Sequence, residues 1–182
     1  MASRIALFPG QGSQFVGMGK DLAEAFPESR ATFEEAGEAL GFDLAKLCFE
    51  GPDSDLVQTH NTQPAILAHS VAALRALEKR GFTPSAAAGH SLGEYTAYVA
   101  AGALAFADAV RLVRRRGELM FAAGQERPGT MAAILGMDGA AVEALCAEIS
   151  QGTVCAANLN SPGQVVISGD PPAVDAAMEA AK

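Results

Sequence analysis

The chain has 182 residues, with 13 Lys and Arg against 21 Asp and Glu and a formal net charge of −8. With 49% hydrophobic and 19% charged residues, the composition excludes a disordered chain and suffices for a packed core. The acidic balance and the lack of tryptophan argue against a nucleic-acid partner. No stretch approaches the roughly 20 apolar residues of a membrane span, and no targeting signal is recognisable. We therefore expect a cytoplasmic protein with no nucleic-acid or membrane partner.

The cysteines are Cys48, Cys146 and Cys155, an odd number without the spacing of metal ligands. Cys146 shares a helical stripe with Val142 and Leu145, which predicts a core position. We expect reduced thiols and no metal site.

Brief buried strands alternate with helices along the first two thirds of the chain. The predicted elements are a strand at 5–8, a helix at 28–40, short helical pieces at 44–49 and 53–57, a helix at 65–80, a strand at 85–89, and helices at 92–101 and 105–123. This alternation predicts the α/β class with a parallel sheet.

From about Glu126 the order changes to strand, helix, strand, strand, helix. The predicted elements are strands at 130–135, 153–157 and 164–168, a helix at 139–149, and a final helix that Asp170 caps. This order is typical of a ferredoxin-like unit that lacks its last strand. We therefore divide the chain into 1–125 and 126–182.

The segment Gly89-His90-Ser91-Leu92-Gly93 fits the nucleophile-elbow pattern, in which a serine lies on a sharp turn between a strand and a helix. The alternative is an ordinary tight turn. In an elbow, the serine hydroxyl projects above the sheet, and the N–H of Leu92 points into the same space. A second oxyanion donor is expected in the glycine-rich loop after the first strand, where the N–H of Gln11 is the candidate. The loop is not a dinucleotide fingerprint, since Phe15 stands where the third glycine is needed.

A serine nucleophile needs a base, usually a histidine. We expect His90 to hold the elbow, because neighbours across a sharp turn point in different directions. His60 is predicted in a polar loop and His69 on a solvent-facing helix flank. No histidine follows His90 in this sequence, whereas the triad histidine of elbow enzymes follows the serine.

Arg116 falls within the predicted apolar arc of the helix at 105–123, together with Leu112, Leu119 and Met120. A guanidinium on a buried face needs an anionic partner. Two partners are open: an internal Asp or Glu, or the carboxylate of a substrate, which matches the planar fork. Three further arginines, Arg111, Arg114 and Arg115, are predicted on the opposite, solvated face, where they could meet an acidic partner.

Five motifs, in their order and spacing, resemble the malonyl-CoA:acyl carrier protein transacylase family, which acts in bacterial fatty-acid synthesis and is related to polyketide synthase acyltransferase domains. They are Gly10–Gln14, Asn61–Ala65, Gly89–Glu94, Arg116-Gly117 with Met120, and Asn158–Gln164.

The resemblance implies an α/β-hydrolase-like large subdomain beside a ferredoxin-like small one. It implies that Ser91 takes a malonyl group from coenzyme A and passes it to the phosphopantetheine thiol of acyl carrier protein. The amides of Gln11 and Leu92 would hold the oxyanion, and Arg116 would bind the malonyl carboxylate. Malonyl-CoA is then a substrate, and no cofactor or metal is expected.

The family continues beyond its ferredoxin-like unit and supplies its catalytic histidine from there. We therefore expect this chain to correspond to the N-terminal portion of the family. We also expect either a further fragment of the same protein as a partner or an inactive polypeptide. The alternatives are a serine thioesterase or esterase, which shares the nucleophile and oxyanion hole, and an inactive malonyl-binding fragment.

Overall fold

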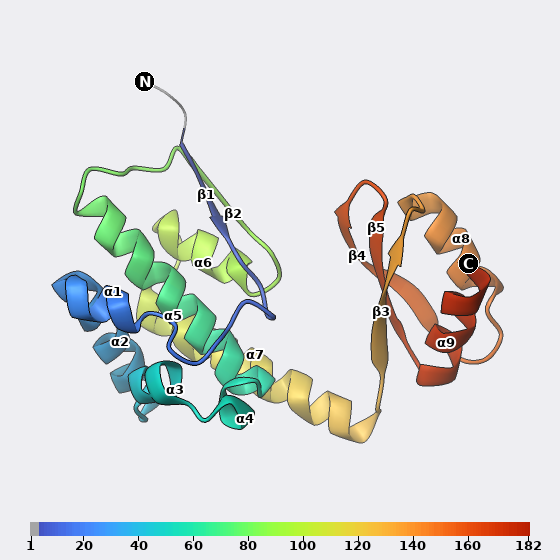
Figure 1. The fold of residues 1–182 in the computed structure, drawn as a ribbon, viewed down its shortest axis with the longest axis horizontal. Helices are drawn as coiled ribbons and strands as arrows, with labels where there is room; N and C mark the ends of the chain where they lie inside the picture. The colour runs from blue at the N-terminus through green and yellow to red at the C-terminus, as the bar shows by residue number, and fades with distance from the viewer. Residues whose placement is uncertain (1–3) are drawn as a thin grey trace. The chain divides into compact units, whose positions relative to one another are not determined.

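A short strand near the start of the chain and another near its middle form a parallel pair (Figure 1). They are β1 (Ile5–Phe8) and β2 (Ala86–Gly89), with Phe8 opposite Gly89. The computed structural model describes residues 4–182. These residues divide into two units, the first extending to Ala122 and the second comprising Ala123–Lys182. The predicted division lies three residues further along the chain.

Strand β1 is half-buried, although the sequence predicted a buried strand. Ala6 and Phe8 pack in one cluster with Leu74, whereas Ile5 and Leu7 are 61% and 76% exposed. Successive side chains of a strand point to opposite faces. Within the described part of the chain, helices cover only one of these faces.

Helices make up most of the first unit. They are α1 (Lys20–Ala25), α2 (Pro27–Leu40), α3 (Leu44–Glu50), α4 (Asp53–Leu56), α5 (Thr59–Glu78), α6 (Gly93–Ala100) and α7 (Phe106–Glu126), whose last turn, from Ala123, belongs to the second unit. Helix α1 was not predicted, because its six residues are too few to show a helical period and its N-cap, Gly19, has no side chain. Helix α5 begins six residues before the predicted start, with Pro64 inside it.

The second unit is an antiparallel sheet with two helices. Its elements are β3 (Thr130–Leu135), α8 (Gly139–Glu148), β4 (Val154–Ser161), β5 (Gln164–Gly169) and α9 (Pro171–Ala180), and the strand order is β3-β5-β4. Strand β4 runs four residues beyond the predicted end at residue 157, and it does so through two register shifts against β5. Cys146 is in the core of this unit, as predicted.

The predicted α/β class is confirmed, with one parallel strand pair and one antiparallel sheet. Within residues 4–182, none of the helices is both long and apolar enough to cross a membrane.

Candidate active site

Ser91 lies on the predicted sharp turn between β2 and α6. Its φ of 52° is the only positive φ of a non-glycine residue within residues 4–182. A Cβ built on Gly89 would lie 1.9 Å from the carbonyl carbon of Gly93, and one built on Gly93 would lie 2.4 Å from the carbonyl oxygen of Phe8. Both positions therefore require glycine, because strand and helix backbones meet there without room for a side chain. The exposed hydroxyl of Ser91 is held in a left-handed turn, a backbone conformation that concentrates at functional sites.

The loop after β1 lies against the elbow. The N–H of His90 donates to the carbonyl of Phe8 at 3.0 Å, and a Cβ on Gly10 would lie 2.6 Å from Nδ1 of His90. Side chains of the loop organise its backbone, since the N–H of Gly12 donates to Oε1 of Gln14 at 2.8 Å. Gln11 is exposed, and its Oε1 accepts a hydrogen bond of 2.7 Å from the hydroxyl of Thr59. The side chain of Gln11 is thus tied to the first turn of α5.

Arg116 reaches the Ser91 hydroxyl. One of its terminal nitrogens donates to Oγ of Ser91 at 3.0 Å, and the other donates to Oε1 of Gln63 at 2.7 Å. Its guanidinium also lies 5.9 Å from the ring centre of Tyr95. Within residues 4–182 no carboxylate forms an ion pair with Arg116, so the predicted alternative of an internal salt bridge is wrong. The two hydrogen-bond acceptors of this cation, Gln63 and Ser91, are therefore both neutral groups.

The apolar arc of α7 is narrower than predicted. Leu112, Leu119 and Met120 are about half exposed, whereas Val113 and Gly117 are buried. Arg116 itself is half-buried rather than enclosed. Helical periodicity thus predicted the correct side of the helix for Arg116 but overestimated its burial.

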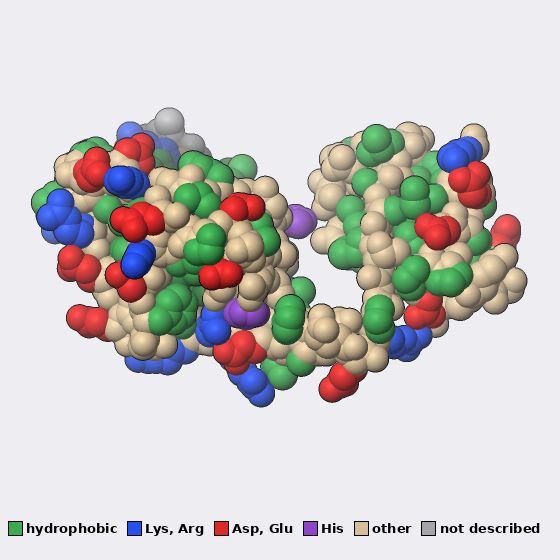
Figure 2. All heavy atoms as spheres, turned by 60° about the horizontal axis from the view of Figure 1, so that its bottom comes forward, with side chains coloured by type: hydrophobic (Ala, Val, Ile, Leu, Met, Phe, Trp, Pro, Cys, Tyr) green, Lys and Arg blue, Asp and Glu red, His purple; other side chains and the backbone are tan. Residues whose placement is uncertain are grey.

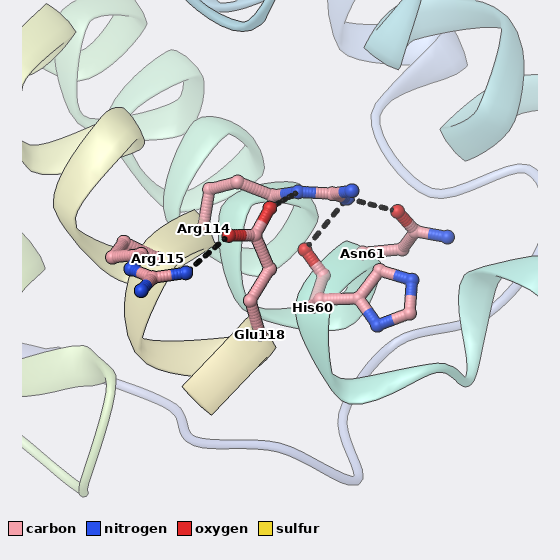
Figure 3. Close-up of polar contacts among 5 residues, drawn as sticks. All are labelled: His60, Asn61, Arg114, Arg115 and Glu118. Carbon is pink, nitrogen blue, oxygen red and sulfur yellow. Dashed lines mark hydrogen bonds and ion pairs between the residues drawn. The ribbon is translucent and has the colours of Figure 1, made fainter. Parts of the chain in front are cut away.

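Arg114 was predicted on a solvated face. Instead it binds the start of α5 (Figure 3). Its guanidinium donates to the carbonyl of His60 at 3.1 Å, to the side-chain oxygen of Asn61, and to a carboxylate oxygen of Glu118 at 3.0 Å. The hydrogen bond from Arg114 lowers the pKa of Glu118. The second carboxylate oxygen accepts from Arg115 at 3.3 Å.

The remaining outward arginine, Arg111, pairs with Asp108 at 3.1 Å. All three predicted docking arginines therefore have carboxylate partners on their own helix. On the face drawn in Figure 2, Lys and Arg side chains likewise lie among Asp and Glu side chains over the first unit. The structure gives no support to an unpaired cationic patch at these positions.

Two histidines differ from their predicted settings. His60 is in the first turn of α5 rather than in a loop, and its ring meets that of Phe121 edge to face at 5.3 Å. His69 is half-buried, and within residues 4–182 its buried Nδ1 has no hydrogen-bond partner. Burial lowers the pKa of His69. Neither ring hydrogen-bonds to Ser91 in the described chain.

Sequence reasoning assigned no role to Thr59 or Gln63. Gln63 was part of the motif Asn61–Ala65, but Pro64 suggested that the helix began there. The signal that could have found them is the spacing of four residues, which places both side chains on one helical face once α5 is known to begin at Thr59.

A serine on a strand-to-helix elbow is the arrangement typical of α/β proteins that use a serine nucleophile. The model of the acyl transferase domain matches residues 6–182, and the chain belongs to that family.

Relatives extend this assignment over the whole chain. The malonyl CoA-acyl carrier protein transacylase of Bacillus subtilis strain 168 is 52% identical over 183 residues, which cover 99% of this chain and 58% of that protein. The protein of the same name from Escherichia coli K12 is 51% identical over 178 residues, with 97% and 58% covered. These matches confirm the resemblance predicted from the motifs.

A solved malonyl-transacylase, in complex with its type II polyketide synthase acyl-carrier protein, is similar to this chain with a TM-score of 0.92 at 46% identity. The match covers 99% of this chain and 59% of that one. This chain therefore spans a little under three fifths of the length of the relatives it matches.

Proposed function

We propose that this chain provides the nucleophile and the carboxylate-binding cation of a malonyl-CoA:acyl carrier protein transacylase, acting in fatty-acid or polyketide biosynthesis. Ser91 Oγ attacks the thioester carbonyl of malonyl-CoA, the carbon–sulfur bond breaks, and the coenzyme A thiol leaves with a proton. The malonyl ester then passes to the phosphopantetheine thiol of acyl carrier protein, and the serine hydroxyl is restored. The observation that carries this proposal is the hydrogen bond of 3.0 Å between Arg116 and Ser91.

Arg116 favours an acyl group that ends in a carboxylate. A simple ester or an acetyl thioester offers no anion to a guanidinium, whereas the free carboxylate of a malonyl group matches its two parallel N–H donors. A malonyl carboxylate bound there would compete with the Ser91 hydroxyl for the same donor. Substrate binding would thereby release the lone pairs of the nucleophile while orienting the thioester toward it.

The amides of Leu92 and Gln11 are the proposed oxyanion donors. Leu92 directly follows the serine and precedes α6, so its N–H lies where an elbow places the first donor. The N–H of Gly12 is engaged by Gln14, which supports Gln11 as the second donor. We further propose an α/β-hydrolase-like architecture for the first unit. For the second we propose a ferredoxin-like one, supported by the antiparallel order β3-β5-β4.

The test is to incubate the chain with malonyl-CoA, alone and with any companion fragment of the same protein, and to measure its intact mass. We expect one malonyl adduct, absent from Ser91→Ala. Arg116→Gln should lower the rate of acylation by about tenfold to a hundredfold, because it removes charge-assisted hydrogen bonds to the substrate. Arg115→Gln is the matched control, since its side chain is exposed on the same helix and should leave the rate unchanged.

The fate of the adduct separates the proposal from its alternatives. Discharge by pantetheine thiols and stability in water would support a transferase, whereas discharge by water would favour the thioesterase. The absence of any adduct would favour a malonyl-binding fragment. The histidine base and a further polypeptide that would carry it stay predictions, as do the cytoplasmic location and the lack of a cofactor or metal.

A further inference from the structure

A chain of side-chain hydrogen bonds leads from the loop after β1 to the Ser91 hydroxyl. The hydroxyl of Thr59 donates to Oε1 of Gln11 at 2.7 Å and accepts from Nε2 of Gln63 at 3.1 Å. Oε1 of Gln63 accepts from Arg116 at 2.7 Å, and Arg116 donates to Ser91 at 3.0 Å. In this series of hydrogen bonds, Thr59 alone connects the loop to the Gln63–Arg116 pair.

Arg116 fixes which group donates and which accepts at each of these hydrogen bonds. A guanidinium can only donate, so Gln63 must turn its oxygen toward Arg116 and its NH₂ group toward Thr59. The oxygen of Thr59 then accepts from Gln63, and its single hydrogen is left for Gln11. Gln63 is 0% exposed, so its amide cannot exchange these partners for water.

Thr59 does not serve its own helix. It is the first residue of α5, where hydroxyl side chains commonly bond to free backbone N–H groups, and the N-cap residue Gln58 has no side-chain cap. The hydroxyl of Thr59 instead reaches Gln11, which is 48 residues away in the sequence. Gln63 follows it by four residues, so both side chains lie on one face of the helix.

We propose that Thr59 is a positioning residue that sets the Arg116 guanidinium through Gln63 and links it to the Gln11 loop. This inference rests on the proposed function. Without the hydroxyl, Nε2 of Gln63 keeps only a weak contact of 3.4 Å to the sulfur of Met120. Gln63 can then rotate, and Arg116 loses the acceptor that holds its plane. Loss of the hydroxyl should therefore weaken the binding of acyl groups that carry a carboxylate and leave the binding of other acyl groups unchanged.

Two substitutions at this position separate the hydroxyl from the shape of the side chain. Thr59→Val keeps the shape and removes the hydroxyl, whereas Thr59→Ser keeps the hydroxyl. Thr62→Val is the matched control, because it removes a buried hydroxyl of the same helix that bonds to the carbonyl of Leu56 outside this chain of contacts. A purely structural loss should affect Thr59→Val and Thr62→Val alike.

The first measurement needs no turnover. The side-chain NH₂ protons of Gln63, observed by NMR in the 182-residue chain, should shift and exchange faster with water in Thr59→Val. They should stay unchanged in Thr59→Ser and Thr62→Val. An unchanged Gln63 amide in Thr59→Val would overturn the proposal, whatever the activity of the protein.

The second measurement is acylation of Ser91 by malonyl-CoA and by acetyl-CoA over a range of concentrations. Thr59→Val should raise the half-saturating concentration of malonyl-CoA about tenfold, the loss expected for one charge-assisted contact, and leave that of acetyl-CoA unchanged. Thr59→Ser should restore the malonyl value. Equal losses for both donors would contradict a positioning role. If neither donor acylates the unsubstituted chain, alone or with a companion fragment, the proposed function fails, and the Gln63 amide alone decides the role of Thr59.

Discussion

Pro64 leaves a gap in the hydrogen bonds of α5 that a residue of another helix fills. In a regular helix the N–H of residue 64 would donate to the carbonyl of His60, but proline has no N–H. A terminal nitrogen of Arg114 donates to this carbonyl at 3.1 Å (Figure 3). The same guanidinium also binds Asn61. Arg114 therefore stabilises the turn that carries Thr59 and Gln63.

This role predicts unequal effects of two neighbouring arginines. Arg114→Met should lower the free energy of unfolding by about 2 kcal/mol, since it leaves the His60 carbonyl unsatisfied and removes hydrogen bonds to a charged group. Arg115→Met should change it by less than about 0.5 kcal/mol, because that side chain is exposed. Urea unfolding measures both values. Equal effects of the two substitutions would contradict the role given to Arg114.

A second substitution isolates the hydrogen bond to the carbonyl. Pro64→Ala restores a backbone N–H that can donate to the carbonyl of His60. Combined with Arg114→Met, it should therefore recover part of the lost free energy of unfolding. Pro64→Ala alone is the control for its effect on packing. Strictly additive free energies in the double variant would show that the carbonyl of His60 is not what Arg114 stabilises.

At the scale of elements, α5 and α7 approach each other closely at one glycine. A Cβ built on Gly117 would lie 2.5 Å from the Cα of His60 and 2.8 Å from the carbonyl oxygen of Thr59. Arg114 and Arg116 both shortly precede Gly117 in α7 and bind residues of α5 there. The absence of a side chain at residue 117 thus allows the two helices to come near enough for Arg116 to reach Gln63.

We therefore expect Gly117→Ala to lower the free energy of unfolding by about 1–3 kcal/mol, since the added methyl group must push backbone apart. It should also slow malonylation of Ser91, because Arg116 moves with its helix. Gly124→Ala is the matched control in α7: a Cβ there meets nothing within 4 Å. Replacing glycine in a helix by alanine without a clash should raise stability by about 0.5–1 kcal/mol. If urea unfolding gave changes in the free energy of unfolding of the same sign for both substitutions, the close approach of α5 and α7 would be refuted.

The sequence predicted the parts of the site that depend on local pattern. Gly89 and Gly93, two residues either side of Ser91, indicated the elbow, and helical periodicity placed Arg116 on the inner side of α7. The start of α5 was wrong because Pro64 is typical of a first turn, and the group that replaces its missing hydrogen bond lies 50 residues further along the chain. No pattern in the sequence reveals such a distant partner. Thr59 and Gln63 were missed because both precede the predicted start of this helix, so their spacing of four residues was not recognised as one helical face.

At the scale of the whole chain, net negative charge coexists with apolar side chains exposed on strands. Leu7 of β1 is 76% exposed in the first unit, and Leu135 of β3 and Leu159 of β4 are 69% and 66% exposed in the second. Exposed apolar strand faces favour association between molecules. A net charge of −8 at pH 7 opposes it by repulsion. Lowering the pH removes this repulsion as the carboxylates take up protons.

The turbidity of the chain should therefore reach a maximum near its isoelectric point, about pH 4.8, and fall on either side. Leu7→Thr combined with Leu159→Thr should lower that maximum without moving it along the pH axis, because the substitutions remove exposed apolar surface and change no charge. Glu24→Gln combined with Glu143→Gln is the complementary variant. These side chains are exposed, and their loss should move the maximum to higher pH at similar height. A maximum of unchanged height in the threonine variant would mean that loss of charge repulsion alone, without these strand faces, drives the association.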